Sequence, residues 1–134
     1  MGRVLAIDYG TVRVGLAMSD PLRIISSPYK TIDYHGNDQL VVDIKKEMIE
    51  NQVDELVLGY PIGLSGNKTP KTLEVEAFCE MLKSEGLKVT LIDESFTSEE
   101  AKKIMHSMGK KTGHNKKMVD QIAASIILKE YLNK

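Results

Sequence analysis

Two apolar stretches with the character of buried strands end in acidic residues. Residues 4–7 are followed by Asp8, and residues 91–92 are followed by Asp93 and Glu94. Sites in open α/β sheets lie at the carboxyl ends of parallel strands, so these acids are expected at one edge of a sheet. Acids can also simply mark where a strand leaves the core, and either stretch alone is compatible with that interpretation.

Asp120 is a third acid, and its place in a helical pattern is unusual for a charged residue. It shares its spacing with the apolar residues Ala123, Ala124, Ile127 and Leu128. Such spacing defines the face that a helix buries, and a buried carboxylate needs a cation, a metal or a hydrogen-bond partner. The two alanines would let the helix approach the sheet and bring Asp120 toward Asp8 and Glu94. The alternative is a first-turn acid that complements the helix dipole.

Together these acids form a ligand set made only of oxygen atoms. Without a histidine or cysteine cluster, such a set suits Mg²⁺ or Mn²⁺ rather than zinc. Two such ions about 4 Å apart can activate a water and stabilise the leaving oxygen in phosphodiester hydrolysis. We therefore predict catalytic roles for Asp8, Glu94 and Asp120, and metal ligation by these three and by Asp93.

A basic segment leads into the helix that carries Asp120. The net charge is −1, so a nucleic-acid partner would have to meet a local patch. Lysines at a helix N-terminus are mildly unfavourable with respect to the macrodipole, and bound phosphates would account for them. A solvated basic loop is the alternative. The lysines predicted to bind nucleic acid are Lys110, Lys111, Lys116 and Lys117.

The glycine-bearing stretch 59–69 resembles a phosphate-binding P-loop but fails on spacing. Asn67 separates Gly66 from Lys68, whereas a P-loop requires Gly and Lys to be adjacent. We expect a turn-rich loop beside the site.

The chemistry-bearing residues are embedded in alternating strand and helix patterns. Strands are predicted at 4–7, 12–18, 23–32, 55–59 and 88–92, with Pro28 placing the third at an edge. Helices are predicted from Asn37 or Asp38 to about Asn51, from Thr69 and Pro70 to Gly86, from Thr97 to about 105, and from 116 to 132. The apolar face of the second helix is predicted to contain Leu73, Ala77, Phe78, Met81 and Leu82. This order predicts one α/β domain, 1–134, with a five-stranded mixed sheet. Strands 1–3 are antiparallel, strands 4 and 5 run parallel to strand 1, and helices cover both faces.

Composition excludes several classes of protein. Of 134 residues, 42% are hydrophobic and 28% charged, which is typical of a globular domain rather than a disordered chain. No apolar run approaches the roughly 20 residues of a membrane span, and no signal-peptide pattern opens the chain, so a cytoplasmic location is expected. The single cysteine, Cys79, is interpreted as packing. The oligomeric state stays open.

The ordered set of motifs resembles the YqgF family, also called RuvX, of Holliday junction resolvases and pre-ribosomal RNA nucleases. The residues that carry the resemblance span nearly the whole chain: Asp8, Gly10, Arg13, Gly15 and Ala17, then Gly59, Pro61 and Gly66, then Asp93, Glu94, Thr97, Ser98 and Ala101, then Lys117, Asp120, Ala123 and Ala124. Ser95 departs from the arginine that usually follows the acidic pair, which affects an expected phosphate contact rather than the metal acids.

The resemblance implies a ribonuclease H-like fold in which Asp8, Glu94 and Asp120 bind metal. It also implies processing of the 5′ end of the small-subunit ribosomal RNA precursor, with resolution of branched DNA as the older proposal. Arg13 of the same pattern is grouped with the nucleic-acid-binding lysines. Two other classes stay open: an actin-like ATP-binding protein, which a chain of this length disfavours, and an RNA-binding ribosome-assembly factor without turnover.

Overall fold

A computed structural model describes residues 2–62, 66–93, 103 and 116–134 of the chain. Its strands are β1 (Arg3–Asp8), β2 (Arg13–Ser19), β3 (Ser26–Asp33), β4 (Val53–Tyr60) and β5 (Val89–Asp93). They form a five-stranded sheet in the order β3-β2-β1-β4-β5. β2 pairs antiparallel with both β1 and β3, whereas β4 pairs parallel with β1 and with β5. The predicted mixed sheet is confirmed, including the edge position of β3.

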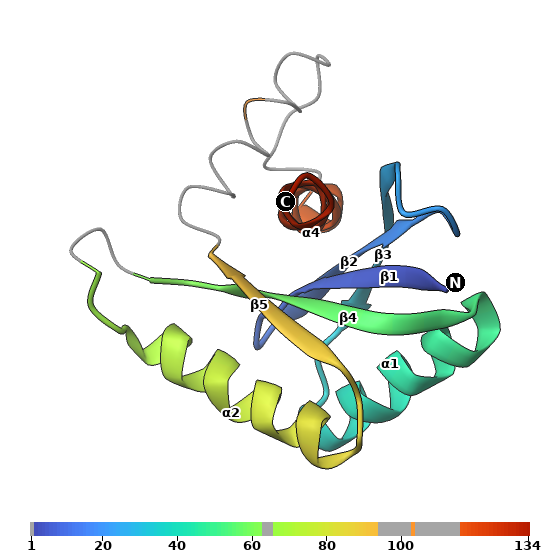
Figure 1. Cartoon of the computed structure of the whole chain (residues 1–134). Coiled ribbons are helices and arrows are strands. Elements are labelled where there is room, and N and C mark those ends of the chain that lie inside the picture. The colour runs from blue at the N-terminus through green and yellow to red at the C-terminus, as the bar shows by residue number, and fades with distance from the viewer. Residues whose placement is uncertain (1, 63–65, 94–102, 104–115) are drawn as a thin grey trace.

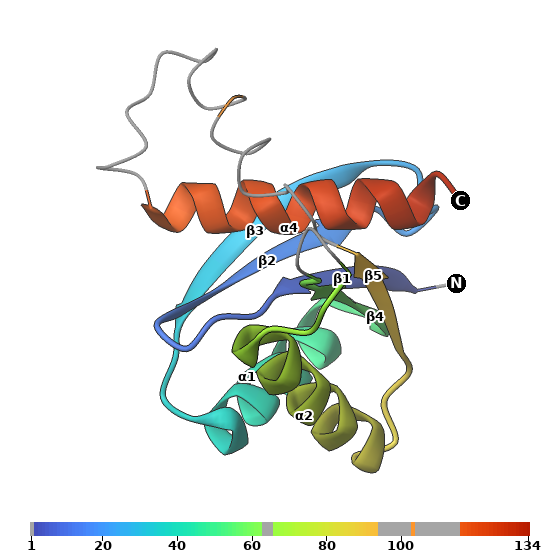
Figure 2. The same cartoon turned by 90° about the vertical axis from the view of Figure 1, so that its left-hand side faces the viewer.

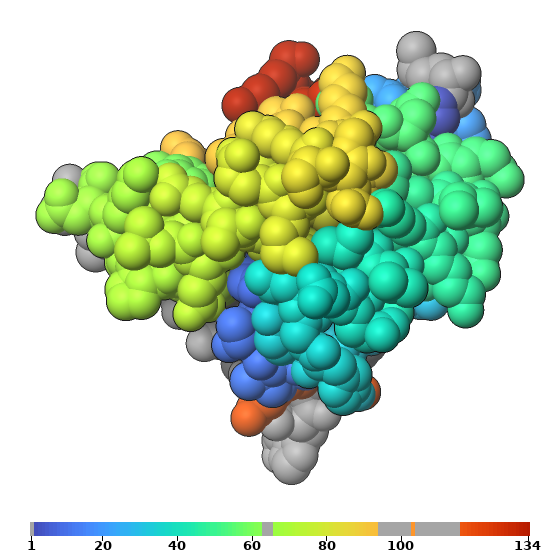
Figure 3. Space-filling view, turned by 90° about the horizontal axis from the view of Figure 1, so that it is seen from below, coloured from blue at the N-terminus to red at the C-terminus, as the bar shows by residue number. Residues whose placement is uncertain are grey.

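The described helices cover the two faces of this sheet unequally. α1 (Asn37–Asn51) and α2 (Pro70–Ser84) lie on one face, and α4 (Lys116–Leu132) crosses the other, as Figures 1 and 2 show. Figure 3 looks onto the first face, where α1 and α2 lie side by side over the strands. None of these described helices is long and apolar enough to cross a membrane.

Alternation along the strands divides the core into two layers. Leu5 and Ile7 of β1 are buried among the side chains of α1 and α2, whereas Val4 and Ala6 are buried beneath α4. Because successive strand residues point to opposite faces, Asp8 shares the α4 face with Ala6. The sequence thus directs the last residue of β1 toward the helix that carries Asp120.

Two local predictions for the helices fail, each for a physical reason. α1 has Gly36 as its N-cap, with no side-chain cap, because the Asn37 amide oxygen instead accepts hydrogen bonds from the Tyr9 and Tyr34 hydroxyls. Leu73 is 56% exposed. The buried residues of α2 are Thr72, Val75, Phe78, Cys79 and Leu82. This face is rotated by one residue from the predicted one, so Leu73 points to solvent.

Other end signals are confirmed. Thr69 caps α2, its side chain accepting from the Thr72 amide, with Pro70 as the first helical residue. Gly86 follows α2 with a φ of 80°, a conformation that favours glycine.

Cys79 is a buried free cysteine, in agreement with its predicted packing role. The predicted helix from Thr97 and the basic loop after it lie outside the described residues, apart from the isolated Lys103.

Candidate active site

A cavity of about 490 Å³ lies at the carboxyl end of β1. The β1–β2 turn, the first turn of α2 and the α4 residue Asp120 surround it. Its lining residues are Asp8, Tyr9, Gly10, Thr11, Val12, Arg13, Pro70, Lys71, Glu74 and Asp120. Two of the three predicted catalytic acids, Asp8 and Asp120, are therefore brought to one cavity from positions more than a hundred residues apart.

Gly15 explains how α4 comes close enough to place Asp120 there. Gly15 is the antiparallel partner of Asp8, and a Cβ on Gly15 would lie 2.1 Å from the carbonyl oxygen of Asp120. Such a contact is impossible, so only a glycine allows α4 to rest on β2 at this point. One turn further along, the predicted close packing is confirmed for Ala124, which is buried against Ala6 and Ala17 of the sheet, whereas Ala123 is buried among residues of α4 itself.

Arg13 provides the charge partner of Asp120. Its Nε donates to Asp120 Oδ2 at 2.7 Å, and the two side chains are 28% and 21% exposed. Asp120 lies beyond the first turn of α4, which contains no acidic residue, so a simple helix-dipole role does not account for it. The expectation that this half-buried carboxylate needs a cation is met within the chain itself.

The donor atoms of the cavity suit a hard metal ion. Asp8, Glu74, Asp120 and Thr11, whose side chains carry oxygen donors, are among the lining residues, and the described lining contains neither histidine nor cysteine. Within the described part of the chain, no three His, Cys, Asp or Glu residues group closely enough to hold a metal ion. The two aspartates therefore fit as part of an oxygen ligand set that needs a further donor.

Comparison with known proteins places the chain. The family model RuvX, described as Holliday junction resolvase, matches residues 2–134. The chain belongs to the RuvX family. A protein of Dictyoglomus thermophilum named "Putative pre-16S rRNA nuclease" is 40% identical over 132 residues, which cover 98% of this chain and 95% of the relative. A protein of the same name from Corynebacterium jeikeium is 37% identical over 134 residues, with 98% and 86% covered.

Solved structures agree on the fold. Thermus thermophilus RuvC in complex with a Holliday junction substrate matches with a TM-score of 0.61 at 9% identity, covering 100% of this chain and 98% of RuvC. The Fowlpox virus resolvase in complex with Holliday junction DNA matches with a TM-score of 0.58 at 12% identity, covering 98% and 97%. The predicted ribonuclease H-like architecture of this RuvX protein is confirmed.

Asp93 is not brought to the cavity. It pairs with Tyr60 at the end of β4, and its charge contributes to a raised pKa of the Tyr60 hydroxyl, after the larger effects of the hydrogen bond to Glu76 and of burial. Ile92, one residue earlier, is buried beneath α4, so alternation directs Asp93 to the opposite face from Asp8. Glu94 lies outside the described residues, as do Lys110 and Lys111.

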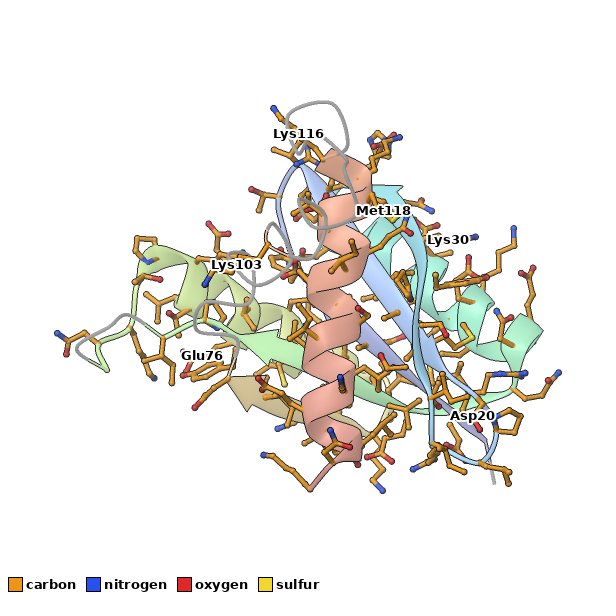
Figure 4. All side chains as sticks on the ribbon, turned by 90° about the horizontal axis from the view of Figure 1, so that it is seen from above. Asp20, Lys30, Glu76, Lys103, Lys116 and Met118 are labelled. Atoms are coloured by element: carbon orange, nitrogen blue, oxygen red, sulfur yellow. The ribbon has the colours of Figure 1, made fainter. Side chains whose placement is uncertain are left out.

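The two described lysines predicted to bind nucleic acid begin α4. Lys116 is exposed and extends from the N-terminal end of the helix (Figure 4). Lys117 has its Nζ 3.9 Å from Asp33 Oδ1, and its carbonyl oxygen accepts from the Thr31 hydroxyl. Asp33 and Thr31 thus fix α4 to the edge strand, while both ammonium groups stay accessible to solvent. Arg13, also predicted to bind nucleic acid, contacts Asp120 in the structure.

Residues of the wall opposite Asp120 were not predicted from the sequence. Pro70, Lys71 and Glu74 form it, and beside them burial and the neighbouring Tyr34 hydroxyl raise the pKa of Tyr9. The Thr69-Pro70 pair correctly located the start of α2. Its direction toward the β1–β2 turn depends on tertiary packing, which no local pattern encodes.

Proposed function

We propose that this RuvX protein is a nuclease that depends on Mg²⁺ or Mn²⁺ and hydrolyses phosphodiester bonds of structured nucleic acid. Its proposed substrate is the 5′ end of precursor 16S ribosomal RNA. The observation that carries the proposal is the convergence of Asp8 and Asp120 on one cavity whose described lining offers only oxygen ligands. The names of its relatives support the RNA substrate.

Asp8 and Asp120 would hold the metal, together with Glu94, which the sequence places after β5. The bound metal would supply an activated water and charge stabilisation for the leaving oxygen. The protein contributes rigidity to this arrangement. Asp8 ends a strand that is paired on both sides, and Asp120 is fixed by the contact of its own backbone with Gly15. A ligand set that is already in place loses little conformational freedom when the metal and substrate bind.

Cationic residues around the cavity would bind the nucleic-acid backbone. Arg13 and Lys71 line the cavity itself, and Lys116 and Lys117 begin the helix that carries Asp120. Contacts of this kind recognise phosphates rather than bases, so they hold a strand in place without specifying its sequence.

A second candidate is resolution of four-way DNA junctions, which the description of the family model favours. Backbone hydrolysis at an oxygen-ligated metal requires no base contact, so the same cavity could serve either substrate. The two functions therefore differ in the nucleic acid that is bound and not in the catalytic residues.

The test compares cleavage by wild-type protein and the Asp8→Asn and Asp120→Asn variants. Each is incubated with end-labelled precursor rRNA and with a four-way DNA junction, in Mn²⁺ or in EDTA. Asp43→Asn is the matched control, because Asp43 lies on α1 outside the cavity and accepts a hydrogen bond from the Gln39 amide at 2.9 Å. Far-UV circular dichroism checks that each variant is folded.

We expect metal-dependent cleavage by the wild type and by Asp43→Asn, and loss of at least two orders of magnitude in both site variants. The cleaved substrate then identifies the function. Full activity in Asp8→Asn and Asp120→Asn would contradict the proposal. Tight RNA binding by the wild type without cleavage in any metal would favour a ribosome-assembly factor instead.

A further inference from the structure

The Arg13–Asp120 pair is open to ligands although it links two ordered elements. Arg13 Nε donates to Asp120 Oδ2 at 2.7 Å, and each side chain keeps more than a fifth of its surface exposed. Both residues line the cavity at the end of β1. A metal ion or a phosphate entering this cavity therefore meets both partners of the pair without any rearrangement of the fold.

Asp120 is the immobile partner. Its backbone rests on Gly15, and hydrogen bonds before and after it attach α4 to β3: the Thr31 hydroxyl donates to the Lys117 carbonyl at 2.6 Å, and the Ser26 hydroxyl donates to the Ser125 carbonyl at 2.7 Å. Asp120 thus has little freedom to leave the cavity.

Arg13 is the mobile partner. It opens β2 directly after the turn at Thr11 and Val12, and only its long side chain reaches Asp120. A guanidinium on such a stem can change its partner by rotamer changes alone.

We propose that Arg13 is an internal cation that neutralises Asp120 in the metal-free protein, yields this carboxylate to the metal and transfers to a phosphate of the bound nucleic acid. The proposal rests on the function proposed above. A divalent ion held by Asp120 would repel a guanidinium at 2.7 Å from the same carboxylate, so the ion and Arg13 compete for it. A planar guanidinium matches a phosphate well, and Arg13 lines the cavity that the substrate would enter.

If Arg13 has this role, removing its charge should raise the affinity for Mn²⁺ and lower the affinity for nucleic acid. Removing the charge with Arg13→Gln should tighten Mn²⁺ binding, because the metal no longer displaces a competitor. The same change should weaken nucleic-acid binding measured in EDTA, because Asp120 then lacks its counter-ion and repels the phosphates of the bound strand. An arginine that merely supported the local structure would weaken both affinities or neither.

The first experiment measures both affinities on the full chain. Mn²⁺ binding is titrated calorimetrically, and binding of a fluorescent RNA hairpin is measured in EDTA. We expect Arg13→Gln to bind Mn²⁺ roughly tenfold more tightly, the scale of one unit charge near a divalent ion in a water-like dielectric. RNA binding should weaken several-fold, and Arg13→Lys should retain Mn²⁺ affinity near that of the wild type. Arg3→Gln is the control, since Arg3 contacts the Asn51 carbonyl away from the cavity.

The second experiment needs no variant. The chain has three arginines, Arg3, Arg13 and Arg23, so their Nε–H signals can be followed individually by ¹⁵N NMR. Mg²⁺ should displace the Arg13 signal and leave Arg23 unchanged, because Arg23 is bound to Asp54 and Glu55 at the other end of the sheet.

The outcomes separate this inference from the function on which it rests. If Mg²⁺ shifts the Asp8 backbone amide while the Arg13 signal stays fixed, or if Arg13→Gln weakens Mn²⁺ binding, Arg13 is no competitor and the inference is wrong. If Mn²⁺ binds equally to the wild type, Asp8→Asn and Asp120→Asn, the proposed metal site itself is wrong.

Discussion

Replacing Gly15 by alanine tests whether the α4–β2 contact positions the site. The added Cβ would lie 2.1 Å from the Asp120 carbonyl oxygen, 2.4 Å from its carbonyl carbon and 2.9 Å from its Cβ. Non-bonded carbon and oxygen atoms need roughly 3.3 Å, so α4 must move away from β2 by about 1 Å. Because the obstacle is backbone, no side-chain rotation relieves it. Overpacking of this severity costs about 3 kcal/mol.

Chemical denaturation and calorimetry measure both consequences. We expect Gly15→Ala to lose about 3 kcal/mol of unfolding free energy in urea, and to bind Mn²⁺ more weakly because Asp120 moves with the helix. Gly36→Ala is the matched control: it has open space around it and a φ of 97°, so it should lose only about 1 kcal/mol by backbone strain and leave Mn²⁺ affinity unchanged. A Gly15→Ala protein with wild-type stability and Mn²⁺ affinity would refute the reasoning.

Two further predictions concern other parts of the chain. Burial would raise the pKa of Glu55, but hydrogen bonds from Tyr131 and Arg23 lower it overall. Because the pKa is lower in the folded than in the unfolded protein, ionised Glu55 stabilises the fold above about pH 4.3. This stabilisation is lost as the pH falls further. Urea unfolding between pH 7 and pH 3 should show this loss of unfolding free energy. Tyr131→Phe should make the loss smaller. If the unfolding free energy falls with pH equally in both proteins, the hydrogen bond from Tyr131 is not its cause. Lys116→Gln and Lys117→Gln should each weaken RNA binding for all sequences and reduce the slope of log affinity against log salt concentration by about 1. Fluorescence anisotropy at several salt concentrations measures this slope. An unchanged slope would mean that these lysines contact no phosphate.

Part of the strand order could be predicted from the sequence because the patterns that indicate it are local, and each is compatible with one arrangement of the strands. The apolar runs on either side of Asp8 and Arg13 are separated by a short turn and must form a hairpin. Pro28 restricts its strand to an edge, and β3 is an edge strand. The caps were less predictable, because Asn37 can cap a helix or bind a distant hydroxyl. Tyr34 lies only three residues before Asn37, but Tyr9 becomes its neighbour only in the folded chain, and both hydroxyls donate to the Asn37 amide oxygen.

The site shows the same distinction between pattern and tertiary contact. Helical spacing alone indicated that Asp120 faces protein and needs a charge partner, and the structure agrees. The spacing could not indicate that Arg13 supplies part of that charge, because the pair closes over 107 residues. Either a metal ion or an arginine would compensate the negative charge of Asp120. The partial burial of this carboxylate alone therefore cannot show which of the two cations it binds.

Asp93 ends its strand as Asp8 does, but strand alternation places the two side chains on opposite faces of the sheet. Grouping acids by their position at strand ends put Asp8, Asp93 and Glu94 together, but successive strand residues cannot share a face. Ile92 is the apolar residue of β5 that lies beneath α4, as Ala6 is in β1. Asp8 lies two residues after Ala6 and shares its face of the sheet, whereas Asp93 directly follows Ile92 and lies on the opposite face, with α2. The sequence alone does not say which side of β5 faces α4, so the burial of Ile92 beneath this helix, which only the folded structure shows, is what separates Asp93 from Asp8.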